Sequence, residues 1–536
     1  MSNCTIKFNR TNSKEINNSD LFMEDFLQQP NVSEARELTD KIFYENKEFI
    51  KFYDYKGYKI SWSWYDNVFQ TSLDYLSIKP LVDVIESNNP TKIIVVGLPN
   101  KYVRILKMYF GKLEVELPKK YSSIKYFQEL LFNMFLLFFT FVSLVYFYFR
   151  KGSNVATRTE DLIFKNTKSD FRLNHLYSKY EENNIQYIEF IRNTSIKTCF
   201  KNIYKRKRLA IYYTSIIYFV SLFSRKKTVF EFPTNFSQSM LYCYASQNIV
   251  LIKSIPIFEK ILKILKINNF VLITFSSRTA HLAIAAKSLS IPVIGIMHGL
   301  SQKEYAVQEF ISPFNEEKKI GCDKYGLWSP YYLEYFKKYS KITPSEGFEY
   351  SGMLRPVGGF VSHSLFKRIS NNKIKVLLIC EPLISALEII PFLNFLLNHD
   401  NIEIAIKTRP MIRDGYYEEL KLELPEIKKL KIYDGKIEDV AKEFDVFLGS
   451  YSTAVIEASL FGKISILLNT KKFGDYFEMD SLIPGHLFLV KTPESLYDNI
   501  ISRVNNENSL GTIKNIRNRF FGDNLDGAQW IIDQLE

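Results

Sequence analysis

The chain has 536 residues, which is more than a single hydrophobic core organises, so at least two domains are expected. It carries 70 Lys and Arg against 58 Asp and Glu, a formal net charge of +12. This excess is spread along the chain and favours anionic partners such as nucleotide diphosphates or acidic lipid headgroups. Zinc-finger spacing, RNP-like aromatic motifs and concentrated basic helices do not occur, which argues against nucleic-acid binding.

The five cysteines are scattered and include no CxxC pair, so neither a disulfide framework nor a cysteine metal site is expected. This usage fits a reducing compartment. The polar amino terminus lacks the apolar run of a secretion signal, and we therefore expect the chain to begin in the cytoplasm.

Residues 1–90 are interpreted as a mixed amino-terminal extension, in which Trp62, Trp64 and Tyr65 form an aromatic cluster typical of core packing. Residues 92–97 then predict a buried strand, which we assign to the same parallel sheet as the strands at 271–296. A first Rossmann-like domain is accordingly expected over residues 91–355.

Two apolar segments interrupt this first domain. Residues 130–149 contain no charge, and a helix of that length reaches about 30 Å, enough to cross a bilayer. A second segment, 209–223, is shorter. Lys and Arg lie at both ends of each segment, which favours helices lying in an anionic cytoplasmic leaflet, so a monotopic or peripheral protein is expected.

The apolar segments allow other placements. A single span would put the strand at 92–97 across the membrane from the strands at 271–296, so it is rejected. Two alternatives remain open: a fully buried core helix, and a two-span hairpin that exports residues 151–208.

The strand pattern places a histidine at an edge where ligands bind. Residues 271–275 predict a buried strand, 280–288 a crossover helix and 292–296 the next parallel strand. His298 follows directly after that strand, and open α/β sheets hold ligands at the carboxyl ends of their strands. A lone histidine is more often structural, but this position favours a functional one.

A second α/β domain is predicted over residues 374–510, after a Gly- and Pro-containing linker at 356–373 and before a carboxy-terminal helix at 511–536. Its expected strands are 374–380, 402–407, 430–433, 445–448 and 464–468.

The most specific local pattern lies in this second domain. A strand ends at Gly449, small hydroxyl residues including Ser450 and Ser452 follow, and a helix begins near Thr453. Helix amides and hydroxyls together suit a phosphate, and Glu457, one turn further on, suits a ribose hydroxyl. The alternative is that Ser452 or Thr453 simply caps the helix, and the two roles are compatible.

Lys407 and Arg409 end another strand of this domain, where they either bind a diphosphate or lie in solvent. Walker A and G-x-G-x-x-G patterns are absent, which argues against P-loop and dinucleotide enzymes, and no G-x-S-x-G elbow occurs. No Asp-x-Asp follows a strand, so no divalent metal is expected, and the chain is expected to use no cofactor.

Taken in order, the motifs resemble a GT-B glycosyltransferase with two Rossmann-like domains. The chain is similar, over roughly residues 270–500, to the bacterial surface and capsular polysaccharide group that includes CDP-glycerol glycerophosphotransferases, Kdo transferases and polysialyltransferases. The matching motifs are Met297-His298-Gly299, residues 325–328, residues 350–355, Lys407-Thr408-Arg409-Pro410 and residues 450–454 with Glu457.

The resemblance implies an inverting, metal-independent transferase that moves a sugar or polyol phosphate from a nucleotide donor to a glycan or lipid-linked acceptor at the membrane. It implies that His298 is the acceptor-activating base and that Ser452 and Thr453 hold the donor phosphate. The group often has His-Pro where this chain has Arg409-Pro410, so a guanidinium would make that contact. A UDP-sugar 2-epimerase-like enzyme and a non-catalytic membrane-bound scaffold are the alternatives.

Overall fold

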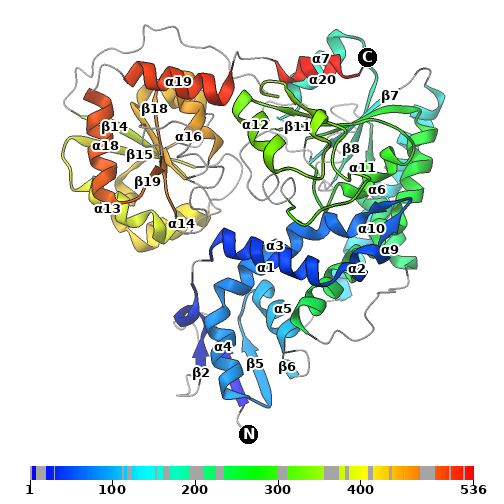
Figure 1. The fold of residues 1–536 in the computed structure, drawn as a ribbon, viewed down its shortest axis with the longest axis horizontal. Coiled ribbons are helices and arrows are strands. Elements are labelled where there is room, and N and C mark those ends of the chain that lie inside the picture. The colour runs from blue at the N-terminus through cyan, green and yellow to red at the C-terminus, as the bar shows by residue number, and fades with distance from the viewer. Residues whose placement is uncertain are drawn as a thin grey trace.

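The computed structural model describes 21 segments of the chain, between which residues are left undescribed. They are 3–7, 20–28, 30–110, 114–116, 123–150, 152, 154–160, 170, 172–192, 209–224, 235–273, 275–297, 311–354, 373–380, 386–408, 415–433, 437–450, 452–470, 489–505, 509–522 and 526–535, with the longest run at 30–110. Figure 1 shows three lobes: the carboxy-terminal domain at upper left, the central domain at upper right and a small amino-terminal lobe below.

The amino-terminal lobe has a parallel sheet of its own. Its strand order is β2 (Asp20–Phe22), β1 (Asn3–Lys7), β5 (Lys92–Val96) and β6 (Glu114–Glu116). The expectation that residues 92–97 join the strands at 271–296 is therefore wrong, and the first Rossmann-like domain does not begin at 91. An apolar run predicts a strand but not its partner, and here the partner is the more polar β1.

Helices connect this lobe to the central domain. The helices α1 (Val32–Glu45) and α3 (Tyr65–Ser77) contact each other, and Trp62, Trp64 and Tyr65 lie in the same buried cluster as the central sheet. The ring of Trp62 stacks on Phe43 at 5.2 Å, and its indole nitrogen donates to Glu316 at 3.1 Å. The aromatic cluster is thus core packing between lobes.

The central domain is built on a seven-stranded parallel sheet. The order is β13-β12-β11-β10-β7-β8-β9, so the chain runs outward from β7 to β9, returns beside β7 at β10 and then runs outward the other way. This is the doubly wound Rossmann arrangement, whose order reverses between β7 and β10. The strands are β7 (Asn154–Thr159), β8 (Tyr187–Ile191), β9 (Ala210–Tyr212), β10 (Ile267–Leu272), β11 (Val293–Ile296), β12 (Lys324–Leu327) and β13 (Phe348–Tyr350).

The carboxy-terminal domain repeats that arrangement with six parallel strands, in the order β16-β15-β14-β17-β18-β19. Its order reverses between β14 and β17. The strands are β14 (Ile374–Ile379), β15 (Ile402–Lys407), β16 (Lys431–Tyr433), β17 (Val446–Gly449), β18 (Ile464–Leu468) and β19 (Leu489–Val490), with α13 (Ile390–Leu397), α14 (Gly415–Glu423) and α18 (Pro493–Asn505) packed on the sheet. The predicted linker, 356–373, lies almost wholly outside the described residues.

The end of the chain joins the two domains. It forms two helices, α19 (Ser509–Phe521) and α20 (Gly527–Asp533), rather than the single helix expected at 511–536. Gly522 ends α19 in the left-handed conformation, at φ +57°, which favours glycine. The helix α19 contacts α12 (Pro330–Tyr339) of the central domain, and α20 packs on α7 (Asn174–Glu182) of the same domain.

The long apolar segment forms α6 (Ser123–Phe149), which lies along the edge strand β9 and contacts α9 (Tyr213–Phe223). Thr140 Oγ1 accepts a hydrogen bond from the Tyr212 amide at 3.1 Å, so α6 covers an otherwise open sheet edge. The opposite face is not covered: Phe138 and Phe141 are 62% and 63% exposed. The fully buried core helix is therefore wrong.

The sheet also bears on the membrane-crossing alternatives. The strands β7 and β8 fall within residues 151–208, yet both pair inside the sheet that holds β10 to β13. A hairpin that exported residues 151–208 alone would break this sheet. A single span is equally incompatible, because the core that packs Trp62 against Phe314 contains residues from both sides of α6.

Candidate functional site

The first part of the candidate site is the point where the strand order of the carboxy-terminal domain reverses. From β14 the strand order continues to β15 and β16 on one side, and from β17 to β18 and β19 on the other. At such a reversal, ligands of open α/β sheets bind at the carboxyl edge. Gly449 and Ser450 lie at the end of β17, on that edge.

Two features mark this part of the sheet edge. A Cβ atom at Gly449 would lie 3.0 Å from the carbonyl oxygen of Ile379 and 2.9 Å from Val455 Cγ2, so only glycine lets the strand end approach β14 and the next helix this closely. The Ser450 hydroxyl beside it is 1% exposed and finds no hydrogen-bond partner among the described residues. A buried hydroxyl without a partner is costly, and a ligand oxygen at this edge would satisfy it.

The turn that follows is tight, and its helix is short. The Ser452 amide donates to the Ser450 carbonyl at 2.6 Å, and Ser452 caps α16 (Thr453–Glu457) without a side-chain hydrogen bond. The helix has five residues before a 3-10 turn continues it, so its dipole is weaker than the sequence pattern suggested. Glu457 is buried at the end of α16, and the Thr453 side chain lies outside the description.

Lys407 ends β15, the neighbour of β14, and is buried with its Nζ donating to the Thr408 carbonyl at 2.7 Å. Its ammonium therefore lies at the same sheet edge as Ser450, rather than in solvent. Arg409, the other predicted cation, lies outside the described residues.

The second part of the candidate site is the corresponding edge of the central sheet. The described backbone after β11 ends at Met297, whose amide donates to the Gly326 carbonyl at 2.9 Å and whose carbonyl accepts from the Trp328 indole at 2.5 Å. His298 is the next residue and lies outside the description, but its point of attachment is held on both sides.

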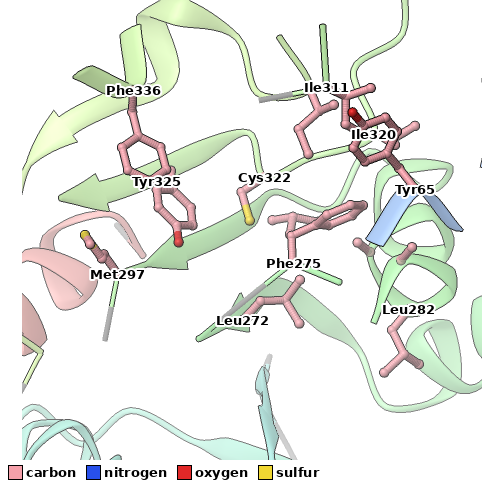
Figure 2. Close-up of a cluster of buried hydrophobic side chains, with 14 of the residues drawn as sticks. Tyr65, Leu272, Phe275, Leu282, Met297, Ile311, Ile320, Cys322, Tyr325 and Phe336 are labelled. Carbon is pink, nitrogen blue, oxygen red and sulfur yellow. The ribbon is translucent and has the colours of Figure 1, made fainter. Parts of the chain in front are cut away.

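Behind Met297 the sheet packs against a dense apolar cluster, shown in Figure 2 with Met297, Tyr325 and Cys322 among its members. Gly295, two residues before Met297, has no room for a Cβ, which would collide with the Tyr325 ring and the Cys322 sulfur. Packing of this kind fixes the backbone as far as Met297, because side chains here cannot shift independently.

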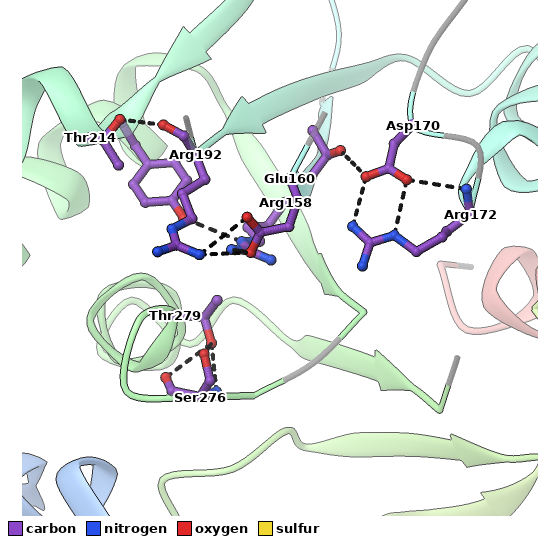
Figure 3. A network of polar contacts seen from close by, with 10 residues as sticks. Arg158, Glu160, Asp170, Arg172, Arg192, Thr214, Ser276 and Thr279 are labelled. Carbon is purple, nitrogen blue, oxygen red and sulfur yellow. Dashed lines mark hydrogen bonds and ion pairs between the residues drawn. The ribbon is translucent and has the colours of Figure 1, made fainter. Parts of the chain in front are cut away.

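A polar network that the sequence analysis missed lies at the same edge, beyond β7 and β8 (Figure 3). Glu160 follows β7 and is hydrogen-bonded by Arg158 and, at 3.3 Å, by Arg192, which follows β8. Beside them Arg172 makes a paired contact with the fully buried Asp170, at 3.0 and 2.8 Å.

Electrostatics keep this network ionised. Burial alone would raise the pKa of Glu160, but Arg158 and Arg192 lower it below the usual value. Burial likewise raises and Arg172 lowers the pKa of Asp170, with a net decrease. His281, next to Arg158, is buried, and burial, followed by the Arg158 charge, lowers its pKa to about 3, so it stays neutral.

One feature of the sequence indicates that such a network exists. Arg158 lies in β7, a strand whose six residues are all buried, and a charge inside such a strand requires a partner. The apolar segment 130–149, which precedes β7, instead favoured an interpretation of this region as membrane-associated. Among the described residues no cluster of three or more His, Cys, Asp or Glu side chains is arranged to hold a metal ion.

Comparison with known proteins gave matches in structure only. No family model and no curated sequence matches the chain. The solved structures that match include the Neisseria meningitidis UDP-GlcNAc 2-epimerase bound to UDP-GlcNAc, with 12% identity, a TM-score of 0.44 and coverage of 72% of this chain and 99% of that one.

Two further matches cover the same shares of the chains. They are MurG of Acinetobacter baumannii, with 13% identity and a TM-score of 0.43, and Anabaena HepE in complex with UDP and glucose, with 11% identity and a TM-score of 0.42. Because these scores lie below 0.5, the assignment of two Rossmann-like domains rests on the strand orders themselves.

The close packing of Gly449 against Ile379 and Val455 predicts how a substitution at Gly449 changes stability. Gly449→Ala should lower the free energy of unfolding by about 1–3 kcal/mol, since the Cβ displaces a backbone carbonyl or forces overpacking. Gly511→Ala is the matched control, because a Cβ there meets nothing within 4 Å and the residue lies in α19. The control should raise stability, by up to about 1 kcal/mol. Equal urea-unfolding midpoints for Gly449→Ala and the wild type would contradict the packing described.

Proposed function

We propose that the protein is an inverting, metal-independent glycosyltransferase of the GT-B type, which moves a sugar or polyol phosphate from a nucleotide donor to a membrane-associated glycan acceptor in surface or capsular polysaccharide biosynthesis. Two Rossmann-like sheets, each with a reversal of strand order at which ligands of such sheets bind, support a donor site and an acceptor site. The observation that carries the proposal is the Ser450 hydroxyl, which is buried without a partner among the described residues, at the same sheet edge as the buried Lys407.

On the donor side, the nucleotide phosphates would lie against Ser450, with Lys407 and Arg409 stabilising the negative charge of the leaving group. Ser452 and Thr453 would add a hydroxyl and amide groups at the turn, and Glu457 is the proposed ribose contact. The glycine at 449 lets the backbone approach the ligand closely.

On the acceptor side, His298 would take the proton from an acceptor hydroxyl. The freed oxygen forms a bond to the transferred sugar carbon or phosphorus as the bond from that atom to the nucleotide phosphate breaks, and the leaving nucleotide keeps the electron pair. A positioned base of this kind contributes typically ~10²–10⁴-fold to the rate.

The proposal also includes attachment of the apolar face formed by α6 and α9 to the cytoplasmic leaflet. The helix covering Phe127–Phe149 is the one helix in the described part of the chain that is long and apolar enough to cross a membrane. It packs on β9, an edge of the sheet whose strand β11 precedes His298. A lipid-linked acceptor on the membrane would thus lie beside the acceptor domain, an arrangement that an epimerase of soluble nucleotide sugars would not need.

The catalytic assignment is tested with His298→Ala and a panel of nucleotide sugars and activated polyols. We expect the wild type to transfer the donor group to acceptor-containing membranes, and the variant to lose at least ~10²-fold in turnover while binding nucleotide as before. Recovery of a donor isomerised at C2 would identify an epimerase instead, and a chain that neither transfers nor isomerises any donor would be a scaffold. Turnover near that of the wild type in a folded variant would remove His298 from the mechanism.

Membrane attachment is tested by sedimentation with vesicles that contain anionic lipid. A variant with Phe138, Phe141, Phe219 and Phe223 replaced by serine should lose most of its binding, because these exposed rings supply the apolar area. The control replaces Leu387 and Leu422, which are 58% and 80% exposed in the carboxy-terminal domain, by serine and should bind like the wild type. Equal sedimentation of all three proteins, or none, contradicts the proposed attachment.

A further inference from the structure

The polar network beyond β7 and β8 contains more positive than negative charge. Within the described residues it has three guanidinium groups, Arg158, Arg172 and Arg192, and two carboxylates, Glu160 and Asp170. Both carboxylates have lowered pKa values and remain ionised, and the neighbouring His281 stays neutral. Among these five side chains, positive charge therefore exceeds negative charge by one.

The three arginines differ in how their donors are used. Arg158 is 5% exposed and donates Nε to the Tyr213 hydroxyl and Nη2 to Glu160. Arg172 donates Nε and Nη2 to Asp170. Arg192 is 22% exposed and, among the contacts of the described residues, its guanidinium uses only Nη1, which it shares between the two oxygens of Glu160. The remaining donors of Arg192 are the ones a ligand would meet.

The place of this network in the fold is where a ligand is expected. Glu160 follows β7, and β7 is one of the two strands between which the order of the central sheet reverses; Ser276 and Thr279 follow the other, β10. Figure 3 draws Ser276 and Thr279 below the arginine network in the same view. A partly buried guanidinium in such a crevice binds an oxyanion well, because its planar fork matches a carboxylate or phosphate and it is weakly hydrated.

We propose that Arg192, with Glu160 and Arg158 holding its guanidinium in place, binds an oxyanion of the acceptor, so that the enzyme selects an acidic acceptor. This inference rests on the proposed function, in which the central domain takes the acceptor. The strand β8 lies three strands from β11, a separation of about 14 Å at the usual strand spacing. The anionic group would therefore lie further along the acceptor than the hydroxyl that reacts at His298.

The test is calorimetric titration of the full chain with two small probes, methyl phosphate and glucuronate, in a Lys407→Met background that weakens anion binding at the donor crevice. We expect at least one probe to bind, and Arg192→Gln to weaken that binding at least tenfold. Arg519→Gln is the control, because Arg519 forms an exposed ion pair with Glu334 on a distant helix. Preference for glucuronate would indicate an acidic sugar, and preference for methyl phosphate a phosphate on the acceptor.

Two results would overturn the inference: no binding of either probe, or equal binding with and without Arg192→Gln. Should Arg192→Gln fail to fold, phenylglyoxal labelling of the wild type gives the same answer, since either probe should protect Arg192 and leave Arg519 reactive; no protection also overturns it. Nucleotide binding, measured on Arg192→Gln without the Lys407→Met change, should equal that of the wild type. Absence of probe binding to the Lys407→Met protein, with nucleotide binding intact in the wild type, would reject this subsite alone. Probe binding that depends on Arg192, without any nucleotide binding by the wild type, would reject the donor site.

Discussion

The account depends on one constraint: parallel strands all end at the same edge of their sheet, and a ligand crevice opens at that edge wherever the strand order reverses. This chain meets the constraint twice, between β7 and β10 and between β14 and β17. The residues to which we assign binding or catalysis lie at or follow these two edges. Ser450 and Lys407 lie at one edge, and His298 and the arginine network follow strands that end at the other.

Aromatic side chains link the strand end before His298 to the helix α19, which lies between the two domains. The Trp328 ring stacks on Phe521 at the end of α19, while its indole nitrogen donates to the Met297 carbonyl. One side chain therefore joins the contact between the domains to the strand end that precedes His298. After α19 the chain returns to the central domain. Asp526, the residue before α20, contacts His175 of that domain, with 2.8 Å between Oδ2 and Nε2. A movement of one domain relative to the other would therefore displace the backbone at Met297.

Local sequence pattern predicted much of this fold, because an apolar run of five or six residues bounded by polar turns has few alternatives to a buried strand. The strands of the carboxy-terminal domain and the position of His298 after a strand were accessible in this way. Pairing partners were not: Lys92–Val96 joins β1 because tertiary packing, not its own pattern, selects the neighbour. The arginine network was harder to predict. Glu160 and Arg192 lie 32 residues apart and meet only when β7 and β8 pair, so the buried Arg158 indicates that a partner exists but not which one.

The central claim is that a nucleotide donor binds where the strand order of the carboxy-terminal domain reverses. Calorimetric titration of UDP, CDP and CMP against Ser450→Ala and Ser465→Ala tests it most directly. Both hydroxyls are 1% exposed and without a partner among the described residues, but Ser465 lies inside β18, away from the carboxyl edge. The account predicts that Ser450→Ala weakens the best nucleotide about tenfold or more, as expected for a lost hydrogen bond to a charged group, while Ser465→Ala leaves it unchanged. Equal affinities for Ser450→Ala and the wild type, or no nucleotide binding at all, would contradict it.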